Sequence, residues 1–292
     1  MDHRLRKKKI AGRKIFSPGR FRLYALTVLG LVLAGLLTSG FAVFAKPDYD
    51  RLNFMQRFVV CGVLAKWLHQ VKTLPEEKRV LVDYNHLLGQ LNVFEKSVVQ
   101  RIFAINPREF GFKGPLHSLE KPDNLVKIMP QAYKRSGQEG STGIQYCPAA
   151  SYNDYLRMMA RMRQELGREL FIESGYRSPG FQAYAFLLYL VRNHDFSLRK
   201  AARLNALPGY SEHQDPVNNA LDFINADGVN GDEPQTPEDF ERLPEYQWLL
   251  KHAHKFNFYL SYPRDNQWGV SFEPWHWHWQ KPASPNSGKQ WQ

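Results

Sequence analysis

Residues 23–45 form an apolar run of 23 residues without one charged side chain (LYALTVLGLVLAGLLTSGFAVFA). A helix of about 20 apolar residues is long enough to cross the hydrocarbon core of a bilayer, which is about 30 Å thick. The sequence therefore predicts one membrane-spanning helix at 23–45, with the rest of the chain divided between the two sides.

The positive charge of the chain is concentrated before this run. Residues 1–22 hold nine Lys or Arg and one Asp, which is +8 of the formal net charge of +11, so the other 270 residues carry only +3. Lys and Arg beside a span stay cytoplasmic, which predicts a basic cytoplasmic tail at 1–22 and an extracytoplasmic body. Because the basicity is confined to this tail, it indicates membrane topology and argues against a nucleic-acid partner.

A cleaved signal peptide would show a similar pattern, with Val43 and Ala45 at suitable positions before the cut. We favour an uncleaved anchor, because the basic stretch is long and the apolar run reaches full spanning length. The expected location is the cytoplasmic membrane, with the body outside. In that compartment Cys61 and Cys147 either pair as a disulfide or remain two buried free thiols, and the sequence leaves both open.

The two halves of the body differ in character. Residues 46–127 are expected to be an accessory, mainly helical region, and from about residue 151 helices and strands mix without βαβ regularity, which predicts an α+β class. The expected helices are at about 50–72, 93–105, 151–167, 179–193 and 246–256, the strands at 169–176, 220–224 and 270–279, and the loops at 107–115, 136–142 and 225–244.

Two clusters in the second half contain the parts of one metal site. PGYSEHQDPVNNALDF holds His213 after a turn and Asp222 on a short apolar strand, and FEPWHWHWQ holds Glu273, His276 and His278. Strand alternation puts the two histidines of the second cluster on one face and three tryptophans on the other. Two imidazoles and a carboxylate suit Zn²⁺, and three protein ligands leave a fourth position open, as in catalytic sites.

Two further residues fit the chemistry of such a site. Zinc lowers the pKa of water toward about 7, and a nearby carboxylate can accept the proton as the water attacks a carbonyl. Glu273, just before the strand, is the expected acceptor. Arg177, in the turn of SGYRSP, is the leading candidate to stabilise the developing oxyanion.

The ordered segments SGYRSPGFQ, LPGYSEHQ…ALDF, WLLKHAHKFNFYLSYP and FEPWHWHW resemble the VanY-like D-alanyl-D-alanine carboxypeptidases of peptidase family M15. The resemblance covers about residues 128–282. It implies a small zinc peptidase domain, with a mixed or antiparallel sheet and flanking helices, that acts on peptidoglycan stem peptides. By position it implies His213, Asp222 and His276 as zinc ligands, Glu273 as catalytic base, Arg177 as the transition-state arginine, and Ser211 and Gln182 as residues that line or support the site.

Two departures from the family pattern concern the site. The family usually spaces its first His and Asp seven residues apart, as HxxGxAxD, whereas His213 and Asp222 are nine apart. A two-residue bulge would preserve both ligand positions, and Asp215 is a competing ligand with poor geometry. His278 stands where the family often has Arg. It shares a face with His276, so it either contacts the substrate, supports a residue that holds the ligands, or faces solvent.

The predicted organisation is a basic tail (1–22), an anchor (23–45), an accessory region (46–127), a zinc peptidase domain (128–282) and a polar tail (283–292). The expected function is removal of the terminal D-Ala from stem peptides. The alternatives are a peptidoglycan endopeptidase of the same family and a non-catalytic zinc or cell-wall-binding module. A serine hydrolase built on Ser211 is disfavoured, because GYSEH lacks the G-x-S-x-G elbow.

Overall fold

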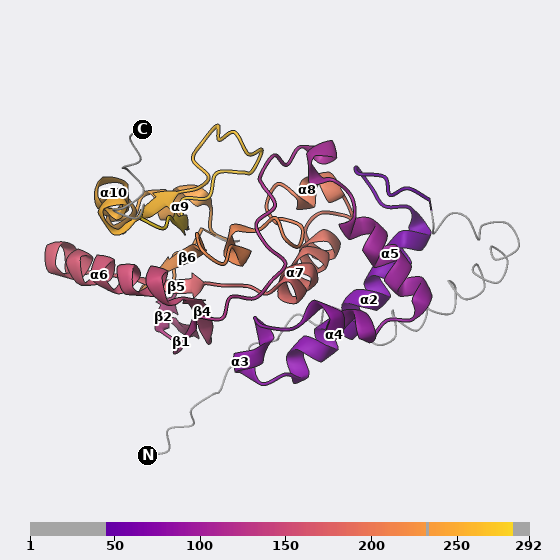
Figure 1. Cartoon of the computed structure of the whole chain (residues 1–292). Coiled ribbons are helices and arrows are strands. Elements are labelled where there is room, and N and C mark those ends of the chain that lie inside the picture. The colour runs from indigo at the N-terminus through magenta and orange to yellow at the C-terminus, as the bar shows by residue number, and fades with distance from the viewer. Residues whose placement is uncertain (1–44, 232–233, 283–292) are drawn as a thin grey trace, which may run out of the picture. The chain divides into compact units, whose positions relative to one another are not determined.

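The structure is a computed structural model that describes residues 45–231 and 234–282 (Figure 1). Residues from Lys46 onward form one compact unit. The predicted basic tail, the predicted span except Ala45, and the predicted polar tail lie outside the described residues. Within the described ranges, no helix has both the length and the apolar character that crossing a bilayer requires. The membrane anchor therefore stays a prediction.

The accessory region is helical, as predicted. Two of its helices confirm the ones expected at about 50–72 and 93–105, and each begins with a capping box, Asn53 with Gln56 and Asn92 with Glu95. The elements are α2 (Phe54–Thr73), α3 (Glu76–Arg79), α4 (Tyr84–Gly89), α5 (Val93–Phe103) and the 3₁₀ turn η1 (Pro107–Phe110).

A four-stranded antiparallel sheet of order β5-β6-β8-β7 is the centre of the second half. Its strands are β5 (Leu170–Ser174), β6 (Ala220–Asn225), β7 (Phe258–Leu260) and β8 (His276–Trp279). In the β6–β8 register, Leu221 lies opposite Trp277 and Asp222 lies opposite His276. Since side chains alternate along a strand, Leu221 and Trp277 point into the core, and Asp222 and His276 point to the opposite face of the sheet.

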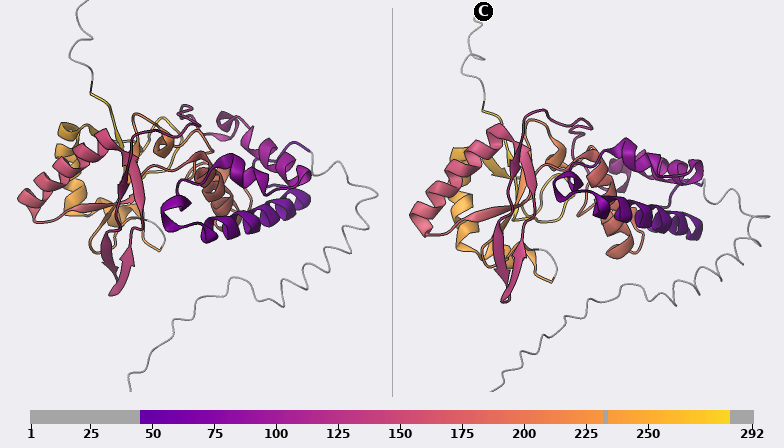
Figure 2. Two further views of the ribbon diagram at one scale, coloured as in Figure 1. Left: turned by 60° about the horizontal axis from the view of Figure 1, so that its bottom comes forward. Right: turned by 90° about the horizontal axis from the view of Figure 1, so that it is seen from below.

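The main hydrophobic core lies between this sheet and the helices on one side of it (Figure 2). Met158, Met159 and Met162 of α6 are fully buried there with Trp248 of α10 and Trp277 of β8. The helices of this half are α6 (Ala149–Leu166), α7 (Pro179–Arg192), α8 (Leu198–Ala201), α9 (Pro237–Glu241) and α10 (Pro244–His252), which continues into the 3₁₀ turn η3 (Ala253–Phe256).

The accessory helices α2 and α4 pack on α7. At the start of α7, the Ser178 amide donates to the Val80 carbonyl (2.9 Å) and the Ser178 hydroxyl to the Val82 carbonyl (2.6 Å). A Cβ on Gly180 would lie 2.3 Å from the same Val82 oxygen, so glycine permits this approach. The accessory region therefore fixes the backbone directly after Arg177.

Two small hairpins precede α6, and the sequence did not predict them. Strands β1 (Leu125–Ile128) and β4 (Gln145–Pro148) form one pair, and β2 (Ala132–Arg135) and β3 (Gln138–Ser141) form the other. The loop expected at 136–142 is therefore wrong for 138–141. The turn itself is at Ser136 and Gly137, whose positive φ angles (50° and 79°) suit a tight hairpin.

Most other elements agree with the sequence. The loop expected at 225–244 is wrong for 237–241, where a capping box of Thr236 and Asp239 starts α9, and the loop expected at 107–115 begins with the 3₁₀ turn η1. The helices expected at 151–167 and 179–193 are α6 and α7, and the α+β class is confirmed. The last strand begins at His276 rather than at residue 270. Cys61 and Cys147 do not pair: both are free thiols, the first exposed and the second buried.

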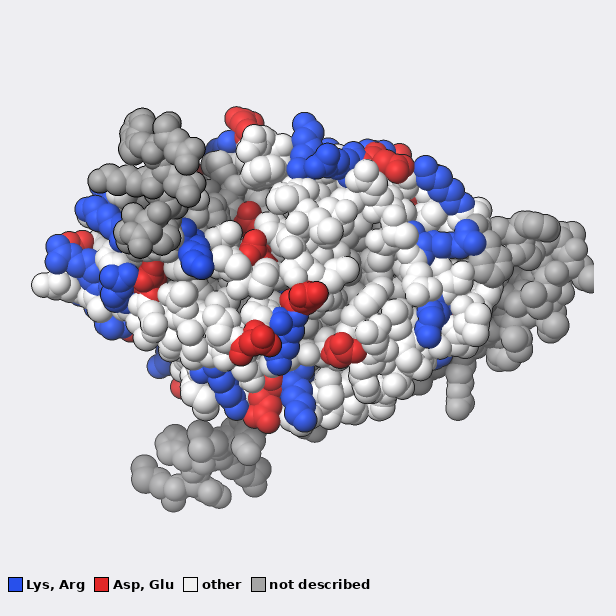
Figure 3. All heavy atoms as spheres, viewed as in Figure 1, with Lys and Arg blue, Asp and Glu red and all other residues white. Residues whose placement is uncertain are grey.

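On the face drawn in Figure 3, basic and acidic side chains of the described residues are interspersed. Ion pairs between elements of the described residues include Lys66 with Glu95 (2.6 Å) and Lys127 with Glu77 (2.8 Å). Exposed pairs of this kind add little stability, but they agree with the small net charge of the body.

Candidate metal centre and pocket

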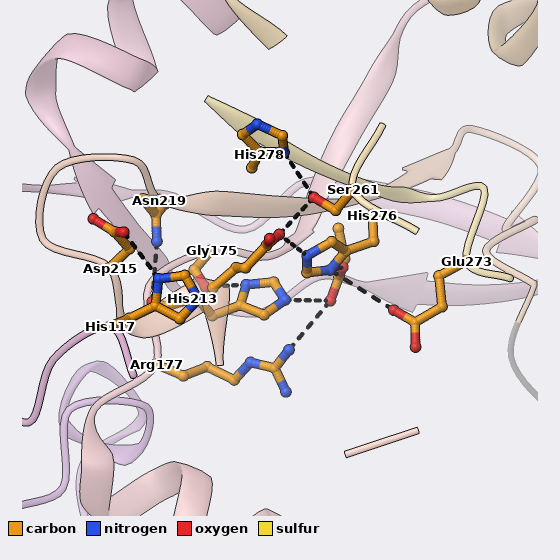
Figure 4. A network of polar contacts seen from close by, with 12 residues as sticks. His117, Gly175, Arg177, His213, Asp215, Asn219, Ser261, Glu273, His276 and His278 are labelled. Carbon is orange, nitrogen blue, oxygen red and sulfur yellow. Dashed lines mark hydrogen bonds and ion pairs between the residues drawn. The ribbon is translucent and has the colours of Figure 1, made fainter. Parts of the chain in front are cut away.

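Three candidate ligands come together from three segments of the chain. His213 lies in the 3₁₀ turn η2 (Glu212–Gln214), Asp222 lies on β6, and His276 is the first residue of β8. Because Asp222 and His276 are opposite each other in the sheet, their side chains share a face. One ligand atom from each of the three residues lies within 4.8 Å of the others (Figure 4).

The donor atoms have the geometry of a metal site. The Nδ1–H of His213 donates to the Gly175 carbonyl (2.8 Å), which leaves Nε2 without a proton. This Nε2 lies 3.0 Å from Asp222 Oδ2, yet it has no hydrogen-bond partner among the described residues. Zinc bonds of about 2.0–2.2 Å place tetrahedral ligand atoms roughly 3.3 Å apart. With no proton on Nε2 to join them, the two atoms are close enough together to be ligands of one cation.

Both ring nitrogens of His276 have carboxylate partners. Nε2 lies 3.0 Å from Glu212 Oε2, and Nδ1 lies 2.8 Å from Asp222 Oδ1. Glu212 also accepts a hydrogen bond from the Ser261 hydroxyl. A carboxylate that holds Nε2–H leaves Nδ1 as the nitrogen for a metal. Glu212 and Ser261 thus orient the ring of His276 toward the ligand group.

The protonation states of these groups follow from burial and from each other's charge. Burial, together with the nearby charge of Arg177, lowers the pKa of His213 to about 4, so its imidazole is neutral at pH 7. Burial opposes the charge of His276, but Asp222 and Glu212 outweigh it and raise the pKa to about 10. His276 would release a proton on binding a metal, because only a bare imidazole nitrogen can be a ligand.

The two carboxylates are held ionised by the histidines. Burial would raise the pKa of Asp222, but its close histidine neighbours, His213 and His276, hold it well below its usual range. Burial also opposes the charge of Glu212, and the bonds from His276 and Ser261 lower its pKa to about 2. An ionised Asp222 is suited to ligate a cation, and an ionised Glu212 is suited to accept the Nε2–H of His276.

Glu273 lies at the edge of this ligand group. Its Oε2 is 3.9 Å from His276 Nδ1, and its side chain is only 10% exposed. The Glu273 amide donates to the Tyr262 carbonyl (3.1 Å), and the His276 amide donates to the Glu273 carbonyl (3.1 Å). This turn brings the carboxylate close to the ligands, where it can exchange a proton with a water molecule bound beside them.

Arg177, in the turn after β5, reaches the same group from another segment. Its Nη2 lies 3.4 Å from Asp222 Oδ2, and its amide donates to the His213 carbonyl (3.2 Å). The Nε of Arg177 is buried and has no hydrogen-bond partner in the described part of the chain. A buried guanidinium N–H without an acceptor is costly, so this group is available to an oxygen of a substrate.

An open cavity of about 370 Å³ adjoins the ligands. Its lining includes Arg177, Gln182, Ser211, His213, Glu273 and His276, which are six of the eight residues that the sequence singled out. Asp222 lies beneath it, in contact with three of these six. The side-chain Nε2 of Gln182 donates to the Ala206 carbonyl (2.8 Å), and the buried Oε1 of the same side chain has no partner among the described residues. This oxygen can accept an N–H from a peptide.

His278 is the candidate that lies outside the cavity lining. Its Nδ1 is 2.9 Å from the Ser261 hydroxyl, and its ring stacks on Tyr259 with centroids 5.8 Å apart. Its bond to Ser261 is visible in Figure 4. His278 is therefore the end of a polar chain that leads through Ser261 and Glu212 to His276.

The lengthened segment between His213 and Asp222 forms a turn beside the site. Asp215 Oδ1 accepts hydrogen bonds from the amides of Val217 (2.8 Å) and Asn218 (2.6 Å). Its Oδ2 lies 3.0 Å from Nδ1 of His117. Both carboxylate oxygens of Asp215 therefore bind partners outside the ligand group. The two extra residues form part of this turn, and His213 still lies 3.0 Å from Asp222.

Sequence reasoning missed several residues of the site. Glu212 had a local signal, because it directly precedes a candidate ligand. Ser261 and Tyr262 lie in the segment WLLKHAHKFNFYLSYP, which carries the family resemblance but shows no ligand or catalytic pattern at these positions. Phe112 had no signal, and only the fold brings these three residues to the site.

Residues 147–282 match the sequence model of VanY, D-alanyl-D-alanine carboxypeptidase. The putative carboxypeptidase YodJ of Bacillus subtilis (strain 168) is 26% identical in an alignment of 181 residues. That alignment covers 55% of this chain and 62% of that protein. A D-alanyl-D-alanine carboxypeptidase of Enterococcus faecium is 31% identical over 107 residues, which are 36% of this chain and 28% of that protein. The match thus spans less than two thirds of either relative.

Among solved structures, the LdcB LD-carboxypeptidase is 28% identical, with a TM-score of 0.42, over 55% of this chain and 69% of that one. A variant of the VanY D,D-pentapeptidase in complex with Zn(II) is 24% identical, with a TM-score of 0.37, over 51% of this chain and 78% of that one. The family match confirms the resemblance to VanY-like D-alanyl-D-alanine carboxypeptidases that the four sequence segments predicted.

Proposed function

We propose that this VanY-like protein is a zinc-dependent carboxypeptidase that removes the terminal D-Ala from peptidoglycan stem peptides. The observation that carries the proposal is the convergence of His213, Asp222 and His276, with Glu273 and Arg177 beside them, at one cavity. The family match over residues 147–282 supports the D-alanyl-D-alanine substrate class. The donor set of two imidazoles and one carboxylate supports zinc.

The residues divide the work of peptide hydrolysis. His213, Asp222 and His276 would hold Zn²⁺, which when bound polarises a carbonyl and lowers the pKa of water. Glu273 would take a proton from the attacking water and return it to the amine of the departing D-Ala as the C–N bond breaks. Arg177 would donate to the carbonyl oxygen as it becomes negative.

The remaining candidates would act on the peptide or on the ligands. Gln182 would accept a substrate N–H at its unpartnered Oε1, and Ser211 would line the same cavity. A direct contact of His278 with substrate stays a prediction. Its bond to Ser261 supports a different role, in which it steadies the Ser261–Glu212 pair behind His276.

For the whole chain, the proposed arrangement is a single-pass protein anchored by residues 23–45, with the catalytic domain outside the cytoplasmic membrane. The support is the apolar run itself and the net charge of +8 in residues 1–22. This location would put the cavity on the same side as its proposed substrate.

The test is to purify residues 46–292 and to measure bound metal by elemental analysis together with D-alanine release from a stem pentapeptide. One zinc per chain with release of D-alanine is the expected result. Zinc without release, but with cleavage of cross-linked peptides, would identify an endopeptidase. Zinc with peptidoglycan binding and no cleavage would identify a binding module. A chain that takes up no zinc would contradict the proposal.

A further inference from the structure

The segment Gly111–Leu119, here called the strap, joins the accessory helices to the first hairpin and runs past the cavity. Phe112 of the strap is 4% exposed and lines the cavity with Arg177, Glu273 and His276. The strap lies well before residue 147, where the family match begins. A part of the chain outside the matched domain therefore contributes a wall to the pocket.

At its start, the strap is attached to the loop that precedes Glu273. The Lys113 amide donates to the Trp268 carbonyl (2.7 Å). Gly269 has a φ of +74°, and a Cβ there would lie 2.2 Å from the Gly111 oxygen, so the two backbones are in direct contact. The strap is thus fixed to the segment that delivers the proposed proton acceptor.

At its other end, the strap is attached to the loop that carries Ser211 and His213. The His117 amide donates to the Gly209 carbonyl (2.7 Å), and His117 Nδ1 lies 3.0 Å from Asp215 Oδ2. The lengthened segment between the ligands is the part that His117 holds. The strap therefore bridges the two loops on which the site is built.

The ring of Phe112 is confined as well as its backbone. It makes an edge-to-face contact with Tyr210, with centroids 6.0 Å apart. A Cβ on Gly114 would lie 2.3 Å from the ring, so the strap folds closely around it. An aromatic ring held on these sides forms a rigid wall, since close-packed side chains yield little to an intruding group.

We propose that Phe112 determines which residue the enzyme releases, by limiting the pocket to a small side chain such as that of alanine. This inference rests on the proposed carboxypeptidase function. The released residue is the end of the peptide, so its side chain would meet the apolar lining beside Phe112 while the rest of the peptide extends to solvent. That lining also includes Ala206, Val270 and Tyr262; of the two aromatic rings, Phe112 is the one that comes from outside the matched domain.

The test uses the zinc-loaded full chain and two stem peptides that differ only in their last residue, D-Ala or D-Leu. The measured quantity is the ratio of kcat/KM for D-Leu to that for D-Ala. Phe112→Ala should raise this ratio at least about tenfold, since a single methylene that a pocket wall does not accommodate costs about 10–200-fold. Leu116→Ala, a matched loss on the exposed side of the strap (60% exposed), should leave the ratio unchanged.

Two additions keep the outcome decisive. Phe112→Trp narrows the pocket and should lower the ratio, so the inference can be tested if the alanine variant does not fold. In a Glu273→Gln background, which prevents turnover, calorimetry would give the affinity for each peptide. The ratio of the D-Leu affinity to the D-Ala affinity should rise with Phe112→Ala and fall with Phe112→Trp. Equal ratios in wild type and both Phe112 variants would overturn the inference. A wild-type protein that neither cleaves nor binds either peptide would instead overturn the proposed function.

Discussion

Glu212 is the residue through which the protein controls the chemistry of His276. Its carboxylate accepts from Nε2 of that ring and from the Ser261 hydroxyl, so it selects the nitrogen that faces the ligand group. An amide in its place could present an N–H to Nε2 and would then favour the tautomer with a proton on Nδ1, the position a metal needs.

Glu212→Gln is therefore expected to weaken zinc binding by about 10–100-fold, the usual effect of losing an outer partner of a ligating histidine. The measurement is the zinc dissociation constant from competition with a chelator. Glu238→Gln, on an exposed carboxylate paired with Arg264 (3.0 Å), is the control and should leave the constant unchanged. Equal zinc affinity in wild type and Glu212→Gln would show that His276 is oriented by other means.

Glu273→Ala tests the separation of proton transfer from metal binding. Its carboxylate is 3.9 Å from His276 Nδ1, near the ligands but outside the set whose atoms converge. We expect kcat/KM to fall by about 10²–10⁴-fold, the usual contribution of a general base, while the zinc content stays unchanged. Activity assays and elemental analysis on the same preparation would check this, and loss of zinc together with activity would assign Glu273 to the ligand set.

The residues that sequence could predict are those whose chemistry is visible in a short motif. His213, Asp222 and His276 are ligand types at family positions, and the β6–β8 register explains why the last two meet. Ser261 and Phe112 are ordinary residues in ordinary contexts. Their relation to the site arises from tertiary packing, which no local pattern encodes.

At the level of elements, Asp154 of α6 ties that helix to the ends of β8 and β7. It is 7% exposed and accepts from Nε1 of Trp279 (2.8 Å) and from the side-chain amide of Asn257 (2.6 Å). Asp154→Ala would leave the buried indole N–H of Trp279 and the half-buried side-chain amide of Asn257 without this acceptor. The expected loss is about 2 kcal/mol in the free energy of unfolding at pH 7, measured by urea denaturation.

The same residue predicts a dependence on pH. Burial opposes the charge of Asp154, but the bonds from Arg157, Trp279 and Asn257 lower its pKa below the usual 3.8. A carboxylate whose pKa is lower in the folded state stabilises the fold at any pH above its unfolded-state pKa. This contribution to stability is lost as the pH falls through the folded-state pKa. The difference between wild type and Asp154→Ala should thus be constant from pH 7 to 5 and shrink below about pH 4.

The exposed Asp227 provides the control, since its side chain is 74% exposed and Asp227→Ala should change stability little at any pH. A gap between wild type and Asp154→Ala that widened in acid would contradict the assigned role of the carboxylate.

The elements that sequence predicted are the ones with a long amphipathic repeat. Helices α2, α6 and α7 each span at least 14 residues, so several turns report the same buried face. Strands β2 and β3 have four residues each, mostly polar and exposed, and carry no alternation of apolar side chains. Their pairing depends on a two-residue turn rather than on a hydrophobic pattern.

At the level of the whole molecule, the accessory region is part of the folded unit. Phe186 of α7 is fully buried and meets Phe103 of α5 with ring centroids 6.0 Å apart, and Ser178 bonds to the backbone after α3. Exposing one large apolar side chain costs about 1.5–3 kcal/mol, against a typical total stability of 5–15 kcal/mol. Residues 128–292 alone should therefore lack cooperative thermal unfolding.

Circular dichroism melts of 46–292 and 128–292 would check this expectation. If 128–292 unfolded cooperatively, with a midpoint within a few degrees of that of 46–292, residues 128–292 would fold independently of the accessory region. The predicted boundary between residues 127 and 128 would then mark a true domain limit.

The strand order β5-β6-β8-β7 has a consequence for how the protein matures during synthesis. The strand that is made last, β8, is an interior strand and fills the place between β6 and β7. Until His276–Trp279 have emerged from the ribosome, β7 has no neighbour and the ligand set is incomplete. A nascent chain that stops short of β8 therefore lacks His276 and cannot assemble the three candidate metal ligands.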